Sequence, residues 1–341
     1  PLIWSTVGLV LTAWLWGRLL VEAGYTQRAW RWLGLVAAVL GPIAVMMPMV
    51  AFVGMEHSLH AAATLALLLG LHRHFSNNGG LALILVGAFF GAAFRIEGLA
   101  PGLIAAVALF LTGSRKGGLA TAAATLLPIA LFMGFLVSQG LDPLPSSVQT
   151  KLSMTDPGNE PGFVQLRLAL LLVNLREPGG LFVAVLAIAS FLMWRATPLK
   201  DTRWGALVLV IGAAAVAHLL AGQIGWLNRY EHYILVLTAA GFLDLLPKAT
   251  GGDVTPLAIG GVAALILGGA VAYRLPMQVF ELPPSARAIH TQQGQMATFV
   301  KDYLETDVAV NDLGYVAWQN DNYVLDLWGL ASAEAREIRT T

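Results

Sequence analysis

Long apolar segments constrain this chain more than any other feature. Charged residues make up only 12% of the 341 residues and apolar residues make up 57%, whereas soluble domains carry about 25% charged residues. A helix needs roughly 20 mostly apolar residues to cross a bilayer, and fewer when its ends snorkel. Ten segments meet this description: 3–20, 32–52, 58–71, 80–94, 98–111, 118–138, 180–194, 204–222, 232–247 and 256–273. The sequence therefore predicts a mostly α, polytopic transmembrane helical bundle.

Two of these segments lie so close together that they require a tight turn. The stretch 80–111 is too long for one crossing, and Arg95-Ile96-Glu97-Gly98 interrupts it. Charged residues are costly in the middle of a membrane helix. We therefore predict a helical hairpin with Arg95 and Glu97 at its tip.

The distribution of lysine and arginine predicts the orientation in the membrane. Alternate connections carry Arg28, Arg73, Arg115, Lys116, Arg195, Lys200, Arg203 and Lys248. The other connections are longer and poorer in cations: Arg95, Lys151, Arg167, Arg176 and Arg229. Short cationic loops remain cytoplasmic. We therefore expect Pro1 and the C-terminal tail on the extracytoplasmic side.

The last part of the chain has the composition of a small soluble domain. We expect a transmembrane domain over 1–273 and an extracytoplasmic α/β domain over 274–341, with Pro276, Pro283 and Pro284 forming a linker. A helix is predicted from Ser285 to about Glu305. Two short strands at 308–312 and 323–327, separated by a helix at 313–319, complete a βαβ-like unit.

The composition also excludes several classes of chemistry. The chain has no cysteine, which excludes disulfides and thiolate catalysis. Its 20 basic and 20 acidic residues balance, so no bulk basic field favours nucleic acid as a partner. The eight tryptophans near span ends are typical of an interfacial belt, and Met46, Met47 and Met49 indicate helix packing.

Polar residues gather at the predicted extracytoplasmic ends of the helices. They form four clusters: Gly54-Met55-Glu56-His57-Ser58-Leu59-His60, Arg95-Ile96-Glu97-Gly98, Leu144-Pro145-Ser146-Ser147-Val148-Gln149-Thr150-Lys151 and Asn228-Arg229-Tyr230-Glu231-His232-Tyr233. Each cluster also has a structural interpretation, in which Glu56 pairs with Arg95, or Glu97 with Arg229. Asp244 and His218 stand alone within spans, and we assign them structural roles.

These residue types suit a lipid-linked phosphate. Arg95, Lys151 and Arg229 are the candidate phosphate ligands, because guanidinium and ammonium groups form charge-assisted bonds with phosphate oxygens. A neighbouring carboxylate can take a proton from a sugar hydroxyl. A metal site of Glu56, His60, Glu231 and His232 is a weaker alternative, since nothing in their spacing is specific to a metal.

Short motifs in the same order resemble a known family. They are Pro1-Leu2-Ile3-Trp4, Gly54-Met55-Glu56-His57-Ser58-Leu59, Arg95-Ile96-Glu97-Gly98-Leu99, Pro145 to Lys151, Arg229-Tyr230, Asn311-Asp312-Leu313-Gly314-Tyr315 and Val324-Leu325-Asp326-Leu327-Trp328-Gly329-Leu330. Together they are similar to motifs of the C-type (GT-C) glycosyltransferases that use polyprenyl-phosphate sugars, especially bacterial terminal arabinofuranosyltransferases. The resemblance runs from residue 1 to about residue 330.

The resemblance implies a multi-pass glycosyltransferase of a bacterial inner or plasma membrane, active in cell-envelope biosynthesis on the extracytoplasmic face. Its donor is a polyprenyl-phosphate sugar and its acceptor a glycan or lipid, with no cofactor required. The family's catalytic Asp precedes the motif at Pro1, so we expect the chain as given to be inactive alone. Supporting carboxylates are then Glu56, Glu97 and Glu231. Substrate-binding roles fall to His57, His60, His232 and Asp312.

Two other classes of function stay open. A transporter or flippase of a lipid-linked sugar places its polar residues near the bilayer midplane, often on broken helices. A non-catalytic protein would only bind the lipid-linked sugar. A continuous polar path across the bundle favours the first alternative, and the lack of an acidic pair before the Pro1 motif favours the second.

Overall fold

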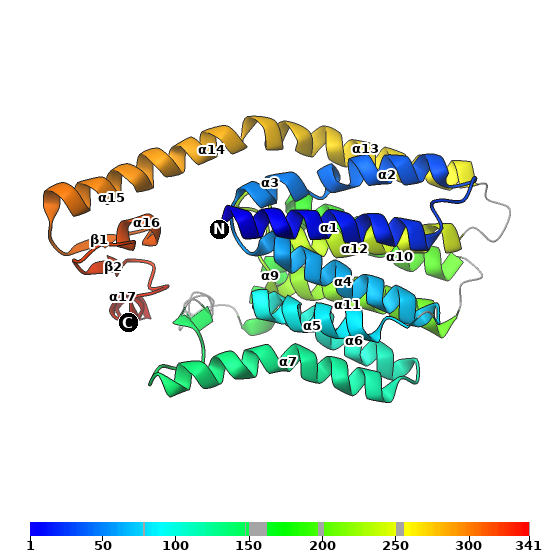
Figure 1. The fold of residues 1–341 in the computed structure, drawn as a ribbon, viewed down its shortest axis with the longest axis horizontal. Helices are drawn as coiled ribbons and strands as arrows, with labels where there is room; N and C mark the ends of the chain where they lie inside the picture. The colour runs from blue at the N-terminus through cyan, green and yellow to red at the C-terminus, as the bar shows by residue number, and fades with distance from the viewer. Residues whose placement is uncertain (78, 147, 150–161, 197–200, 250–255, 341) are drawn as a thin grey trace. The chain divides into compact units, whose positions relative to one another are not determined.

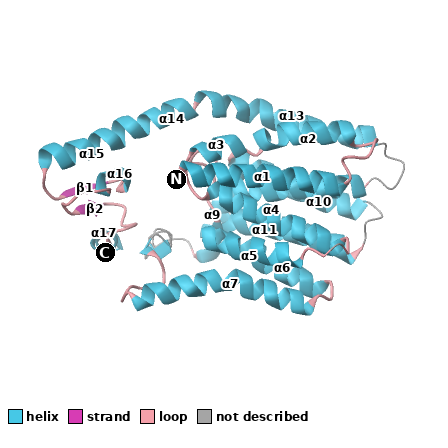
Figure 2. Ribbon diagram, viewed as in Figure 1, coloured by secondary structure: helices cyan, strands magenta, loops and turns pink. Residues whose placement is uncertain are grey.

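The computed structural model describes residues 1–77, 79–146, 148–149, 162–196, 201–249 and 256–340. Helices dominate these residues, as Figures 1 and 2 show. The helices up to residue 280 are α1 (Leu2–Ala23), α2 (Arg31–Ala44), α3 (Met47–Phe52), α4 (His57–Phe75), α5 (Leu81–Phe94), η1 (Ile96–Gly98), α6 (Leu99–Leu111), α7 (Arg115–Ser138), α9 (Phe163–Arg176), α10 (Pro178–Ala196), α11 (Thr202–Ala221), α12 (His232–Leu245), η2 (Leu246–Lys248) and α13 (Pro256–Phe280).

The chain divides into two compact units. The first, here the helical unit, comprises 1–130 and 167–278. The second comprises 131–166 and 279–341. The helical unit holds most of the predicted spans and all the predicted site residues except Lys151 and Asp312.

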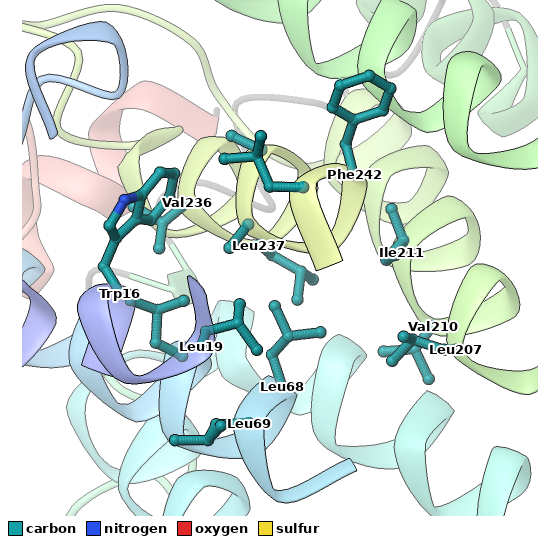
Figure 3. Packing of buried hydrophobic residues seen from close by; sticks show 14 of the residues in the cluster. Trp16, Leu19, Leu68, Leu69, Leu207, Val210, Ile211, Val236, Leu237 and Phe242 are labelled. Carbon is teal, nitrogen blue, oxygen red and sulfur yellow. The ribbon is translucent and has the colours of Figure 1, made fainter. Parts of the chain in front are cut away.

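The core of the helical unit surrounds α4 and α12. Every residue of α12 is buried, from His232 to Leu245. Figure 3 shows side chains of this core, including Trp16, Leu68, Val210 and Leu237, which come from α1, α4, α11 and α12. A helix that is apolar on all sides belongs in the centre of a bundle. This central position explains the apolar composition of α12.

Glycines allow α5 to approach α4 closely. A Cβ built on Gly87 would lie 2.4 Å from the backbone nitrogen of Leu67, and one on Gly70 would lie 2.7 Å from that of Ile84. Small residues at such contacts are typical of helix packing in membranes, where dispersion forces replace the hydrophobic effect. The hairpin of α5 and α6 is thereby anchored to the central helix.

Among the described residues, five helices are long and apolar enough to cross a membrane: Leu2–Ala23, Arg115–Ser138, Pro178–Arg195, Thr202–Ala221 and a segment of the helical run Ala258–Leu304. The same residues include the shorter apolar helices Arg31–Ala44, Leu81–Phe94 and Ile96–Leu111. The prediction of a mostly α protein with several candidate membrane spans is therefore confirmed. The hairpin at Arg95 is present as well, because α5 ends at Phe94 and Arg95 is extended, with φ −153° and ψ 140°.

The predicted span 32–52 is not one continuous helix. The helix breaks between α2 and α3 at Met46, which has the left-handed φ of 64°. The side chains of Met46, Met47 and Met49 are buried, as helix packing requires. The sequence analysis also missed α9, because Gln165, Arg167, Asn174 and Arg176 interrupt its apolar residues.

The prediction of an extended proline linker is also wrong. Pro276 lies inside α13, which ends at Phe280. The next helix, α14 (Leu282–Ile289), begins two residues later and has proline in its first turn. Proline is tolerated in the first turn, because the backbone N–H groups there have no partner within the helix. The prolines at 283 and 284 therefore begin a helix instead of forming an extended connection.

The C-terminal tail forms the small α/β structure that the sequence predicts. The expected helix is present as α14, η3 (His290–Gly294), α15 (Gln295–Phe299) and η4 (Val300–Leu304). Strands β1 (Val308–Val310) and β2 (Val324–Asp326) pair in parallel, with Val308 opposite Val324, and α16 (Gly314–Ala317) connects them. Val300, Val310, Val316 and Val324 form the core, and α17 (Ala333–Thr340) follows.

Candidate functional site

Three chain segments meet at one end of the helical unit. The first is the turn before α4, where Gly54 takes a φ of 73°. The second is the α5–α6 turn, held close because a Cβ on Gly98 would lie 2.2 Å from the backbone of Gly91. The third is the loop before α12. These segments bring together six residues, which we call the Arg95 cluster: Glu56, His57, Arg95, Glu97, Arg229 and Tyr230.

Arg95 joins two carboxylates at the centre of this cluster. Its Nη1 lies 2.6 Å from Oε1 of Glu56, and its Nη2 lies 2.9 Å from Oε1 of Glu97. The Arg95 side chain is 13% exposed, whereas those of Glu56 and Glu97 are 35% and 25% exposed. The predicted Glu56–Arg95 pair is therefore present, but Glu97 pairs with Arg95 and not with Arg229. The three residues together carry one excess negative charge.

Tyr230 connects Arg95 to Arg229. The Arg95 Cζ lies 5.7 Å from the centroid of the Tyr230 ring, and the Arg229 Cζ lies 5.1 Å from it. Both distances fall within the range of a cation–π interaction. One aromatic ring thus holds two guanidinium groups near each other.

Arg229 differs from Arg95 in its partners. Its Nη1 donates to Sδ of Met55 at 3.3 Å and its Nη2 to the Tyr230 hydroxyl at 3.3 Å, and its Nε is buried without a partner. No carboxylate of the described residues forms an ion pair with it. Arg229 is therefore the cation of the cluster with unused charge and donors for an anionic ligand.

The loop that presents Arg229 has an unusual backbone. Trp226, Leu227 and Asn228 have φ values of 50°, 61° and 55°, directly after Gly225 at 109°. Left-handed conformations of non-glycine residues cost free energy and cluster at functional sites. The sequence analysis did not foresee this strained loop, because three successive non-glycine residues do not favour it.

Glu231 supports this loop from within the bundle. Its side chain is fully buried, and Oε2 accepts a hydrogen bond from the Gly225 N–H at 3.0 Å, whereas Oε1 has no partner among the described residues. Oε1 faces α10, where a Cβ on Gly179 would lie 2.9 Å from it. Burial raises the pKa of the Glu231 carboxyl to about 7. Glu231 therefore stabilises the loop that carries Arg229.

Of the three histidines assigned to substrate binding, His57 is the one that joins the cluster. Its ring lies edge-on to Tyr230 at 6.0 Å, and Nε2 is 3.4 Å from Nη1 of Arg95. His60 is buried and stacks on Tyr233 at 4.4 Å. His232 is also buried and contacts the Val45 carbonyl oxygen through Nδ1 at 2.8 Å. His60 and His232 therefore lie in the protein interior below the cluster.

The residues proposed as an alternative metal site do not gather. His232 and Glu231 are occupied with backbone groups, and His60 faces Tyr233. Within the described ranges, no three His, Asp or Glu side chains lie close enough to share a metal ion. The geometry gives this alternative no support.

Besides His60, His232 and Glu231, two further predicted site residues are not part of the cluster as described. Lys151 lies outside the described residues. Asp312 belongs to the second unit, where it is exposed and borders a pocket of about 340 Å³ with Val308 and Gln293. The motif Val324–Leu330 has a structural role at Asp326, whose Oδ2 accepts hydrogen bonds from the Leu330 and Ala331 N–H groups.

A second set of ion pairs lies at the opposite end of the helical unit. Asp244 contacts Nδ1 of His72 at 2.7 Å and Nζ of Lys248 at 2.5 Å. The expectation that Asp244 stands alone is therefore wrong. His218 is not isolated either, since its Nδ1 lies 3.0 Å from the Tyr233 hydroxyl. His72 lies 172 residues from Asp244, so the local pattern did not reveal this pair, whereas Lys248 is the local i,i+4 partner that the sequence analysis missed.

Comparison with known proteins adds one match. Residues 286–341 match a domain of unknown function, DUF8728. This region covers the small α/β structure from within α14 to α17. No curated protein and no solved structure matches the chain.

Proposed function

We propose that this chain belongs to a membrane glycosyltransferase that transfers a sugar from a polyprenyl-phosphate donor to an extracytoplasmic glycan or lipid. The observation that carries the proposal is the convergence of Glu56, Arg95 and Arg229 at one end of the helical unit. The family resemblance of their motifs supports the same reaction. In this proposal the chain crosses the membrane ten times, and the Arg95 cluster lies at the extracytoplasmic face of a bacterial inner membrane.

The ion pairs favour different roles for the two arginines. Arg229 would hold the phosphate of the donor, because its charge is not neutralised by a carboxylate of the described chain. Arg95 is already shared by Glu56 and Glu97, so it would orient these carboxylates. Lys151 remains a proposed second phosphate ligand.

Glu56 is the carboxylate best placed to face a substrate. Glu56 is the more exposed of the two carboxylates that pair with Arg95, and its Oε2 makes no hydrogen bond to the described residues. An oriented carboxylate can accept a hydrogen bond from a sugar hydroxyl. We propose this supporting role for Glu56 and Glu97, and the role of catalytic base for the Asp that the family places before the Pro1 motif.

The interior of the bundle counts against transport. Between Thr64 and His72, α4 presents Leu, Ala and Gly only, and between Thr238 and Asp244 α12 presents Ala, Gly, Phe and Leu. A transport path usually carries polar groups near the midplane. Near the middle of these two central helices the polar side chains are Thr64 and Thr238, whose hydroxyls donate to carbonyl oxygens of their own helix. A non-catalytic lipid-sugar binder remains the alternative that the enzymatic test must distinguish.

The test measures sugar transfer by the full natural protein in proteoliposomes, with synthetic polyprenyl-phosphate sugars as donors. We expect Arg229→Ala to lower turnover about 100-fold or more, as expected when one preorganised charge contact is removed. Arg229→Lys should recover part of the activity, because the charge returns without the fork geometry. Arg203→Ala, at the other end of the unit, is the matched control. Equal activity of Arg229→Ala and wild type would reject the assignment of Arg229 as the phosphate ligand. If the wild-type protein binds the donor but transfers no sugar, the non-catalytic binder is favoured instead.

A further inference from the structure

An apolar groove lies between α1 and α2, at the end of the helical unit opposite the Arg95 cluster. Its volume is about 500 Å³. The residues along it are Gly17, Leu20, Val21, Gly34, Leu35 and Ala38. The first half of α1 is near the cluster, since Ser5 Oγ donates to the Met55 carbonyl oxygen at 2.7 Å. The groove begins at Gly17, more than two helical turns further along α1, and its lining continues to Tyr25 and Thr26 in the α1–α2 turn.

The sides of the groove are open and apolar. Val21 is 48% exposed and Leu35 is 65% exposed, although both belong to helices of an apolar bundle. Gly17 deepens the groove, because a Cβ there would meet nothing within 4 Å. Gly34 instead packs tightly, since a Cβ there would lie 2.9 Å from the Cβ of Tyr25. Such a surface fits a flexible hydrocarbon chain, which can follow an irregular channel between two helices.

Cations lie at the mouth of the same groove. Arg31 borders it directly, and Arg28 is exposed in the turn before α2. Neither forms an ion pair with a carboxylate of the described residues. The acid nearest in sequence, Glu22, is already bridged by Arg18 at 2.9 Å and Arg73 at 2.7 Å. This end of the unit therefore carries a surplus of positive charge.

An apolar channel that ends in unneutralised arginines complements one kind of molecule. Basic pockets between transmembrane helices bind the head groups of anionic lipids, because the charge attraction adds to the burial of the acyl chain. The Thr26 hydroxyl, also at the mouth, supplies a further donor for a phosphate oxygen. A zwitterionic lipid would fill the channel equally but would gain less from the arginines.

We propose that the α1–α2 groove binds an anionic membrane phospholipid, with an acyl chain against Gly17 and Gly34 and the phosphate at Arg31. The site is separate from the Arg95 cluster and does not rest on the proposed enzymatic function. Its occupant comes from the bilayer around the protein. A lipid bound here would cover the exposed apolar sides of α1 and α2 and fix the turn between them.

The experiment compares lipids that differ in head group alone. The full chain, purified in detergent, is exchanged into mixed micelles containing equal amounts of phosphatidylglycerol and phosphatidylcholine with identical acyl chains. Native mass spectrometry then counts the lipids retained by each protein molecule. We expect wild type to retain phosphatidylglycerol about fivefold more than phosphatidylcholine, the preference expected of one arginine near an anionic head group.

Two variants test the two halves of the site. Arg31→Gln should remove the preference for phosphatidylglycerol, whereas Arg203→Gln, an exposed arginine at the same end of the unit, should leave it unchanged. Gly17→Leu should lower the retention of both lipids, because it fills the empty channel. Gly269→Leu is its control, since a Cβ on Gly269 of α13 also meets nothing within 4 Å.

Several outcomes would overturn the proposal. They are equal retention of the two lipids by wild type, an unchanged preference in Arg31→Gln, and an unchanged lipid count in Gly17→Leu. A change from dimer to monomer in Gly17→Leu without loss of lipid would assign the groove to a second copy of the chain instead. Arg31 is exposed, so Arg31→Gln should fold. It can decide the question even if Gly17→Leu does not fold.

Discussion

Arg95 donates from Nη1 to Oε1 of Glu56 at 2.6 Å, across 39 residues of sequence. The pair connects the turn before α4 to the tip of the α5–α6 hairpin, and Glu97 adds a second carboxylate from the hairpin itself. Without Arg95, two carboxylates would face each other with no cation between them. The geometry of the whole cluster therefore depends on this guanidinium.

We predict that Arg95→Ala lowers both stability and sugar transfer. The loss in stability should be about 1–3 kcal/mol, less than for a fully buried pair, since the carboxylates are partly exposed. Adding Glu56→Gln should then cost little more, because its partner is already gone. Thermal unfolding of the two single variants and the double variant in detergent measures this coupling. Strictly additive losses would show that the pair does not hold the two segments together.

A second prediction concerns the pH dependence that comes from Glu231. Its pKa is raised from 4.5 to about 7 by burial, so the folded protein binds this proton more tightly than the unfolded chain does. The resulting stabilisation is complete below about pH 4.5 and is lost as pH rises through 7. Glu231→Gln should therefore stabilise the protein at pH 8 by up to about 3 kcal/mol, and change little at pH 5.

Thermal unfolding at the two pH values checks this prediction. Glu231→Ala is the matched comparison, because it removes the acceptor for the Gly225 N–H and should destabilise at both pH values. If Glu231→Gln had the same effect at pH 5 and pH 8, the buried carboxyl would not be the titrating group.

Local sequence patterns predicted two features of the structure. The hairpin tip at Arg95 could be predicted, since an apolar stretch too long for one crossing was interrupted by charges. The parallel pair of β1 and β2 could be predicted as well, because two short β-branched segments flanked a helical one. Both features depend on local sequence.

The direction in which each polar side chain points could not be predicted. Glu56 and Glu231 look alike in sequence, but one is partly exposed at the cluster and the other is buried against Gly179. Tyr230 contacts two arginines and follows a loop whose left-handed backbone at Trp226, Leu227 and Asn228 is not favoured by its residue types. The break at Met46 was missed for a similar reason: tertiary packing of buried methionines overrides the local helical pattern.

A third prediction tests the second unit. Asp326 accepts hydrogen bonds from the N–H groups of Trp328, Leu330 and Ala331 and is 2% exposed. Asp326→Ala should destabilise the β1–β2 structure by about 2–4 kcal/mol, because buried donors lose their partner. Asp326→Asn should be milder, and Asp321→Ala, an exposed neighbour, should be neutral. Limited proteolysis of the tail measures the effect, and equal resistance of all three variants would contradict the structural role.

A fourth prediction concerns membrane orientation. The 341 residues contain no cysteine, so a single introduced cysteine can report which side of the membrane its position occupies. Trp226→Cys, in the loop of the Arg95 cluster, should react with an impermeant maleimide added outside intact cells. Thr26→Cys, at the opposite end, should react only after permeabilisation. The reverse pattern would place the cluster on the cytoplasmic side and contradict the proposed topology.

The position of the donor phosphate tests the central claim most directly. We expect a cryo-electron microscopy map of the full natural protein with bound polyprenyl phosphate to place phosphate oxygens about 2.7–2.9 Å from the Arg229 guanidinium. In that complex Glu56 and Glu97 should still be paired with Arg95. A phosphate bound away from Arg229, at the bilayer midplane or at the opposite end of the helical unit, would contradict the assignment of the Arg95 cluster as the sugar-transfer site.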